Sequence, residues 1–153
     1  TALGQGEVTA TPLQVSRVIS TIARNGKKTN PIIIKNKDSN GIYTNNAERQ
    51  IIDKKTALSL KDILTRVVEE GTANKAKMKE IKVAGKTGTA EIDDRTENTH
   101  AWFAGFAPVN EPRVAIVVFL EKGGVGGKDA APLFKNIVSN LFIKDKGELN
   151  EKK

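Results

Sequence analysis

The chain has 153 residues, enough for one domain with a real hydrophobic core, and 38% of them are hydrophobic. It contains no cysteine, which excludes disulfides, a cysteine nucleophile and thiolate metal sites. The net charge is +7 but only 5% of the residues are aromatic, so the chain lacks stacking platforms for bases and we expect no nucleic-acid partner.

The first predicted element is a helix that begins after Thr11. Thr11 is a good N-cap, Pro12 suits the first helical position and Gly26 provides an exit. Apolar residues recur with helical spacing at Val15, Val18, Ile19 and Ile22. This spacing predicts a helix with one buried face.

A small hairpin and a second helix are predicted next along the chain. The β-branched run at 31–34 and the segment 41–44 are expected to pair as a small hairpin around residues 38–40. A second helix is then predicted between its N-cap Asp53 and Gly71. Its apolar stripe consists of Ala57, Leu60, Leu64, Val67 and Val68.

Three strand candidates follow, over residues 82–91, 100–107 and 113–121. Because their connections are short, we expect an antiparallel three-stranded meander. The third strand is apolar on both alternating faces, which is typical of a strand with a layer on each side. A glycine-rich stretch at 123–127, interpreted as a flexible connection, leads into a last helix expected over residues 130–142.

The most informative stretch is Lys86-Thr87-Gly88-Thr89, in the first of these strands. Strand alternation places Lys86 and Gly88 on one face and the two threonines on the other. A lysine offers positive charge to an anionic substrate, hydroxyls bind a carboxylate, a glycine lets the substrate lie close, and an edge amide can donate to an oxyanion. A phosphate-binding loop is excluded because Glu80 stands where its leading glycine belongs. Taken alone, the triplet also fits a surface strand with an ordinary exposed lysine.

Five blocks in order along the chain resemble class B high-molecular-weight penicillin-binding proteins. They are residues 3–14 with Gly-Gln-Gly and Thr-Pro-Leu-Gln, residues 67–73, residues 84–91, residues 101–108, and the glycine loop followed by residues 131–134. The resemblance is strongest to the transpeptidases of cell elongation or sporulation. It implies an α+β fold, namely the later part of the penicillin-binding transpeptidase (serine β-lactamase-like) fold, with antiparallel strands packed against helices.

The resemblance also implies roles for individual residues. Lys86 assists the catalytic hydrogen-bond network, and the amide of Thr89 forms half of the oxyanion hole. The hydroxyls of Thr87 and Thr89 hold the carboxylate of a D-Ala-D-Ala stem peptide or of a β-lactam, and Gly88 keeps the strand accessible. Trp102 and Phe103 are expected to pack within the sheet. No cofactor and no metal are expected.

The chain departs from the family in lacking the motifs Ser-x-x-Lys, which carries the nucleophile, and Ser-x-Asn. Neither motif is formed by any of the five serines, Ser16, Ser20, Ser39, Ser59 and Ser139. Because both motifs precede the Gly-Gln-Gly block in the family, we expect a piece of a longer protein that cannot acylate alone. Residues 1–142 would be the C-terminal part of the transpeptidase domain, and residues 143–153 a charged, disordered tail.

These features leave two functions open. The first is a peptidoglycan D,D-transpeptidase whose missing residues come from another chain, and the alternative is a non-catalytic β-lactam sensor or inactive binding module on the same scaffold. The family resemblance implies a parent protein anchored in the cytoplasmic membrane with this domain on its outer face, although the chain itself is expected to be soluble. The apolar strand 113–121 would lose its family neighbours, so we expect pairing with the missing N-terminal part or a swapped oligomer.

Overall fold

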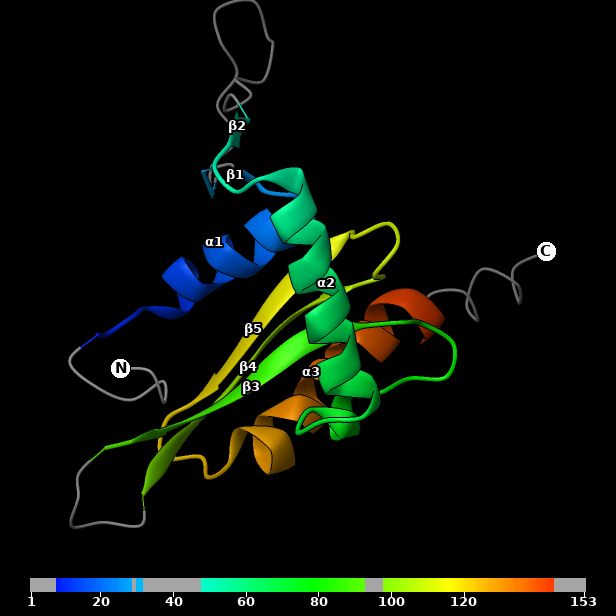
Figure 1. Cartoon of the computed structure of the whole chain (residues 1–153). Coiled ribbons are helices and arrows are strands. Elements are labelled where there is room, and N and C mark those ends of the chain that lie inside the picture. Colours follow the sequence, from blue (N-terminus) through cyan, green and yellow to red (C-terminus); the bar gives the residue numbers. More distant parts are fainter. Residues whose placement is uncertain (1–7, 29, 32–47, 93–97, 145–153) are drawn as a thin grey trace, which may run out of the picture.

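The computed structural model describes residues 8–28, 30–31, 48–92 and 98–144. Its larger sheet contains β3 (Ala84–Glu91), β4 (Thr99–Ala107) and β5 (Val114–Leu120). Two helices, α1 (Pro12–Ala23) and α2 (Lys54–Glu69), lie on one face of this sheet, and α3 (Ala131–Ser139) lies on the other (Figure 1). The described residues also form three short helical turns: η1 (Asn74–Ala76), η2 (Gly126–Ala130) and η3 (Asn140–Lys144).

Helix α1 begins as predicted, because Thr11 and Gln14 form a capping box. The Thr11 hydroxyl accepts a hydrogen bond from the Gln14 amide at 3.2 Å, and the Gln14 side chain accepts one from the Thr11 amide at 2.7 Å. Two amides that the first helical turn leaves unpaired are thereby satisfied. The chain leaves the helix through Gly26, which has a φ of +89°.

The N-cap of α2 is also confirmed, since the Asp53 carboxylate accepts from the Thr56 amide at 3.2 Å. The buried positions of this helix differ from the predicted stripe. Ala57 and Val68 are buried, but they share the buried face with Lys61 and Thr65, while the two leucines pack at its side toward α1. The difference arises because α2 contacts both β3 and α1. The apolar side chains of α2 are therefore divided between the sheet and α1.

The strands form the predicted antiparallel meander, in the order β3-β4-β5, with ends that differ from the expected ones by one or two residues. Strands β3 and β5 are therefore the edges of this sheet within the described part of the chain. A separate two-residue ladder joins β1 (Lys27–Lys28) to β2 (Arg49–Gln50). The hairpin predicted over 31–34 and 41–44 falls almost entirely outside the described residues.

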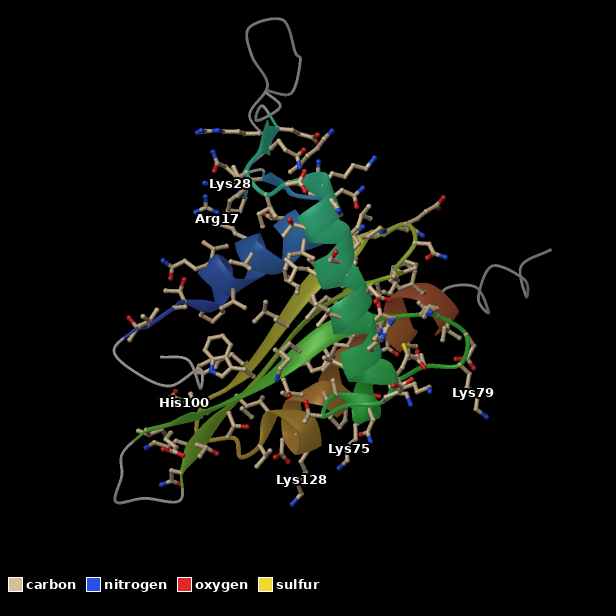
Figure 2. The ribbon with its side chains drawn as sticks, viewed as in Figure 1. Arg17, Lys28, Lys75, Lys79, His100 and Lys128 are labelled. Carbon is tan, nitrogen blue, oxygen red and sulfur yellow. The ribbon has the colours of Figure 1, made fainter. Side chains whose placement is uncertain are left out.

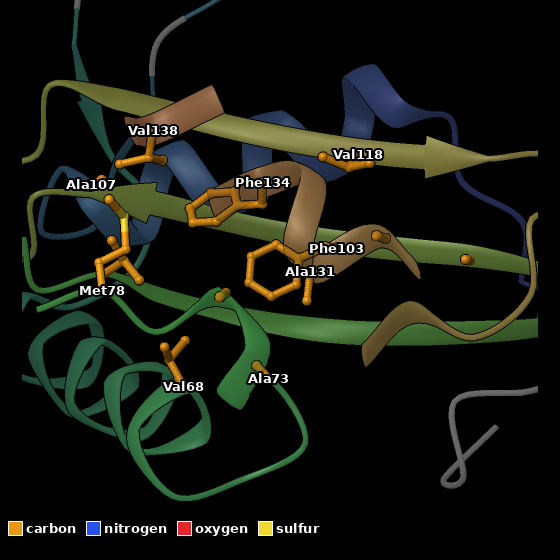
Figure 3. Packing of buried hydrophobic residues seen from close by; sticks show 13 residues of the cluster. Val68, Ala73, Met78, Phe103, Ala107, Val118, Ala131, Phe134 and Val138 are labelled. Carbon is orange, nitrogen blue, oxygen red and sulfur yellow. The ribbon is translucent and has the colours of Figure 1, made fainter. Parts of the chain in front are cut away.

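Apolar side chains pack on both faces of the sheet. On the α3 side, Phe103 of β4 and Phe134 of α3 are fully buried with their ring centroids 4.5 Å apart (Figure 3). On the opposite side, Phe106 packs with Ile19 and Ile22 of α1. Burying one such phenylalanine contributes roughly 2 to 3 kcal/mol. Side chains from the two faces of β5 pack into the two cores, as the apolar character of both faces predicts.

The interpretation of the glycine-rich stretch 123–127 as a flexible connection is wrong for Gly126 and Gly127. Residues 126–130 form the π-helical turn η2, and Gly126 is buried. A Cβ atom at Gly126 would lie 2.3 Å from the Gly88 carbonyl oxygen and 2.4 Å from that of Trp102. The glycine is needed for close backbone packing rather than for mobility.

The last predicted helix is divided into elements of different geometry. Only α3 is α-helical, and η2 and η3 are π-helical turns on either side of it. Residues 145–153 of the predicted tail lie outside the described residues. Over the described ranges, every helix falls short of the length and apolarity that a membrane crossing requires.

Candidate active site

Strand β3 presents the Lys-Thr-Gly run at an edge of the described sheet. Its register pairs Thr87 with Phe103 and Gly88 with Trp102 of β4. Since Phe103 packs against α3, the threonines at 87 and 89 lie on the α3 face, and Lys86 with Gly88 on the α1 and α2 face. The predicted alternation of the four residues is therefore confirmed.

Two polar side chains, those of Thr72 and Lys86, lie next to Thr87. The Thr87 hydroxyl lies 3.1 Å from the hydroxyl of Thr72, which belongs to the connection between α2 and η1. The Lys86 ammonium group donates to the Thr87 carbonyl at 2.8 Å and approaches the Thr87 hydroxyl at 3.4 Å. Lys86 is exposed, so these bonds do not withdraw its charge from solvent.

Thr89 is oriented by a different segment. Its hydroxyl oxygen accepts a hydrogen bond from the Gly126 amide of η2 at 3.2 Å. A threonine hydroxyl has one proton to donate and can accept two bonds, so this contact leaves the proton of Thr89 available. Because Thr89 is exposed, its hydroxyl can donate this proton to an anionic ligand that approaches from solvent.

Gly88 lies between two close neighbours. A Cβ atom built on it would lie 3.2 Å from the Cβ of Trp102, and the Gly88 backbone is also approached closely by Gly126. The sequence alone predicted that this glycine allows access to the strand. What the structure shows at Gly88 is close packing against η2 and the tryptophan.

Aromatic side chains line β4 and β5 on the Lys86 side. Trp102 stacks on Phe119 at a centroid distance of 4.4 Å, and His100 lies 5.2 Å from the same ring. The His100 Nδ1 atom accepts from the Lys122 amide at 3.1 Å, which supports a structural role for the only histidine of the chain. Trp102 and Phe103 pack within the sheet as predicted.

The neighbourhood of the site is basic. Lys75 of η1 and Lys128 of η2 are exposed and project at the same end of the molecule (Figure 2). Among the described residues, neither of them nor Lys86 forms an ion pair. Uncompensated positive charge near exposed hydroxyls favours an anionic ligand. The described residues contain no group of three or more metal-ligating side chains.

Sequence reasoning did not assign a role to Thr72 or to Gly126. Thr72 lies in the block of residues 67–73 and Gly126 in the glycine loop, but neither spacing nor periodicity indicates that these residues reach β3. Thr72 lies 15 residues from Thr87, and Gly126 lies 37 residues from Thr89.

Comparison with known proteins shows the family and the fold class of the chain. Residues 1–139 match the model of the penicillin-binding protein transpeptidase domain. The chain belongs to this family, and its α+β fold class is confirmed by solved structures. A structure of penicillin-binding protein A from Mycobacterium tuberculosis, a ceftriaxone acyl-enzyme complex, has a TM-score of 0.79 and 29% identity over 90% of this chain and 34% of that one.

Curated relatives carry related names. The peptidoglycan D,D-transpeptidase PbpA of Mycolicibacterium smegmatis is 36% identical over 144 residues, which cover 86% of this chain and 29% of the relative. The stage V sporulation protein D of Bacillus subtilis is 34% identical over 171 residues, which cover the whole of this chain and 26% of the relative. The chain thus spans less than a third of the length of these two relatives.

Proposed function

We propose that the chain is the later part of a peptidoglycan D,D-transpeptidase that cross-links stem peptides by serine acyl transfer. It supplies the Lys-Thr-Gly strand, while the nucleophile and the general base come from residues outside the chain. The observation that carries the proposal is the edge strand β3, where two threonine hydroxyls lie next to an exposed lysine that forms no ion pair with any of the described residues. The names of the relatives support the same class of reaction.

Each residue of the strand has a distinct role in this proposal. The Lys86 ammonium group provides fixed positive charge and assists the catalytic hydrogen-bond network. The hydroxyls of Thr87 and Thr89 donate to the terminal carboxylate of a D-Ala-D-Ala stem peptide or of a β-lactam. The Thr89 amide forms half of the oxyanion hole, and Gly88 keeps the strand accessible.

The chain alone is expected to be inactive. None of its five serines stands in Ser-x-x-Lys or Ser-x-Asn, so the acyl-enzyme bond has no nucleophile within the chain. The remaining groups bind a ligand but do not provide the nucleophile of acyl transfer. We place the site in the complete protein on the outer face of the cytoplasmic membrane, where its peptidoglycan substrate is assembled.

The experiment compares the complete protein with its Lys86→Ala variant. Labelling with a fluorescent penicillin and turnover of a D-Ala-D-Ala peptide are measured side by side. We expect both activities in the wild type, and a fall in acylation of roughly 10²- to 10³-fold in the variant, because a preorganised charge at the reacting centre is lost. The free energy of unfolding should change by less than about 0.5 kcal/mol, since an exposed strand lysine adds little to the core.

Lys79→Ala is the matched control, because Lys79 is also exposed but belongs to the connection before β3. This variant should acylate like the wild type. Unchanged acylation in Lys86→Ala would remove Lys86 from the mechanism. Acylation without peptide turnover in the wild type would favour the alternative, a β-lactam sensor, and absence of both would contradict the whole assignment.

A further inference from the structure

We propose that Thr72 is a positioning residue of the same site, and that it sets the direction in which the Thr87 hydroxyl donates its proton. The inference rests on the proposed function, because it concerns how the strand holds a carboxylate. Thr72 belongs to neither β3 nor the Lys-Thr-Gly run. Its hydroxyl nevertheless lies within hydrogen-bond distance of the Thr87 hydroxyl, at 3.1 Å.

The possible proton arrangements around Thr87 are few. The hydroxyl of Thr87 has one proton to donate and two acceptor positions. The Lys86 ammonium group, 3.4 Å away, can only donate to it. If Thr72 also donates, both acceptor positions are filled and the Thr87 proton points to the ligand. If Thr87 instead donates to Thr72, its proton is no longer available for a carboxylate.

A bound carboxylate selects between these arrangements because an ionised carboxylate only accepts hydrogen bonds. It favours the arrangement in which Thr72 donates and Thr87 passes its own proton outward. The same logic holds for Thr89, whose hydroxyl already accepts from the Gly126 amide at 3.2 Å. In this arrangement each of the two hydroxyls accepts a hydrogen bond from a neighbour. Thr89 accepts from the Gly126 amide, and Thr87 accepts from the Thr72 side chain.

The backbone around Thr72 is held in place on two sides. The amides of Gly71 and Ala73 both donate to the Val67 carbonyl at the end of α2, at 3.1 and 3.2 Å, and Ala73 is fully buried. On the other side η2 packs closely, since a Cβ atom at Gly127 would lie 2.6 Å from the Thr72 carbonyl oxygen. The Thr72 hydroxyl is therefore carried by a fixed backbone, which is what a positioning residue needs.

The test uses Thr72→Val and Thr72→Ser in the complete protein. Valine keeps the shape of threonine without the hydroxyl, and serine keeps the hydroxyl. The second-order rate constant of acylation by benzylpenicillin should fall roughly 3- to 10-fold in Thr72→Val, the range that one net hydrogen bond represents, and should stay within about twofold in Thr72→Ser. Thr56→Val, at an exposed threonine in the first turn of α2, is the matched control and should leave the rate unchanged.

A second ligand separates positioning from a general structural effect. Benzylpenicillin methyl ester has no free carboxylate, so its rate constant should be the same in Thr72→Val and in the wild type. Thr72→Ala gives a second variant without the hydroxyl if the valine does not fold. The proposal is overturned if the hydroxyl-free variants acylate with benzylpenicillin as fast as the wild type, or if they lose as much rate with the ester. A wild type that neither ligand acylates would instead refute the proposed function.

Discussion

Lys61 shows how a single residue can oppose the stability of the fold that contains it. It is the only charged side chain among the described residues that is buried, at 8% exposure, and no carboxylate within those residues pairs with it. Its ammonium group lies 5.9 Å from the centroid of the Phe106 ring. Burial lowers the pKa of Lys61 below its usual 10.5, because removal from water disfavours the charged form.

We predict that Lys61→Met stabilises the complete domain by about 1 kcal/mol at pH 7. The folded pKa is lower than the unfolded pKa, so the unfolded state binds more protons between the two values, and wild-type stability rises with pH across that window. The variant should lack this rise. Urea denaturation at pH 7 and pH 10 measures both effects, with Lys55→Met at an exposed position of α2 as control. Equal stability of wild type and variant at both pH values would contradict the prediction.

At the scale of elements, η2 connects the sheet to the candidate site. Its Gly126 approaches the Gly88 and Trp102 backbones, and its amide orients Thr89. Its Gly127 approaches Thr72. A turn of five residues thereby contacts β3, β4 and the connection after α2. Its close packing gives a structural reason for the glycines that composition alone assigned to a flexible loop.

Gly126→Ala should destabilise the complete domain by about 1 to 3 kcal/mol, because the added methyl group overlaps backbone atoms that cannot move independently. A lower melting temperature in differential scanning calorimetry would report the loss. Gly88→Ala is the comparison, since its methyl group would meet only the Trp102 side chain, at 3.2 Å, and the loss should be smaller. If the Gly126→Ala domain has the same melting temperature as the wild type, η2 can move away from β3 without loss of stability, and the prediction is wrong.

At the scale of the whole molecule, β5 has a neighbouring strand on only one side within the described residues. Phe119 on this strand is 36% exposed, and it stacks on Trp102 of β4. An apolar edge strand offers unpaired backbone groups together with apolar side chains, which favours pairing with another chain. The positive charge of the chain opposes self-association only partly, because salt screens it beyond about 10 Å.

We predict that the chain alone associates with itself, and that the preceding part of the transpeptidase domain, added as a second chain, replaces this association. Sedimentation velocity over a hundredfold range of concentration measures both states. Phe119→Ser should weaken self-association, whereas Leu133→Ser, at a position of α3 with a similar exposure of 41%, should not. A stable monomer at all concentrations would rule out the pairing.

Much of the fold follows from short stretches of sequence. The caps at Thr11 and Asp53, the alternation in β3 and the meander depend on hydrogen bonds and periodicity within a few residues, and these were predicted correctly. The order of motifs was enough to indicate the family. The hairpin at 31–34 and 41–44 stays a prediction.

Only the tertiary structure decided which residues surround the Lys-Thr-Gly strand. Thr72 reaches Thr87 because α2 ends beside β3, and Gly126 reaches Thr89 because η2 packs across the sheet. The burial of Lys61 likewise depends on how α2 is rotated between β3 and α1. Such contacts result from the packing of whole elements, whereas local periodicity determines only which elements form.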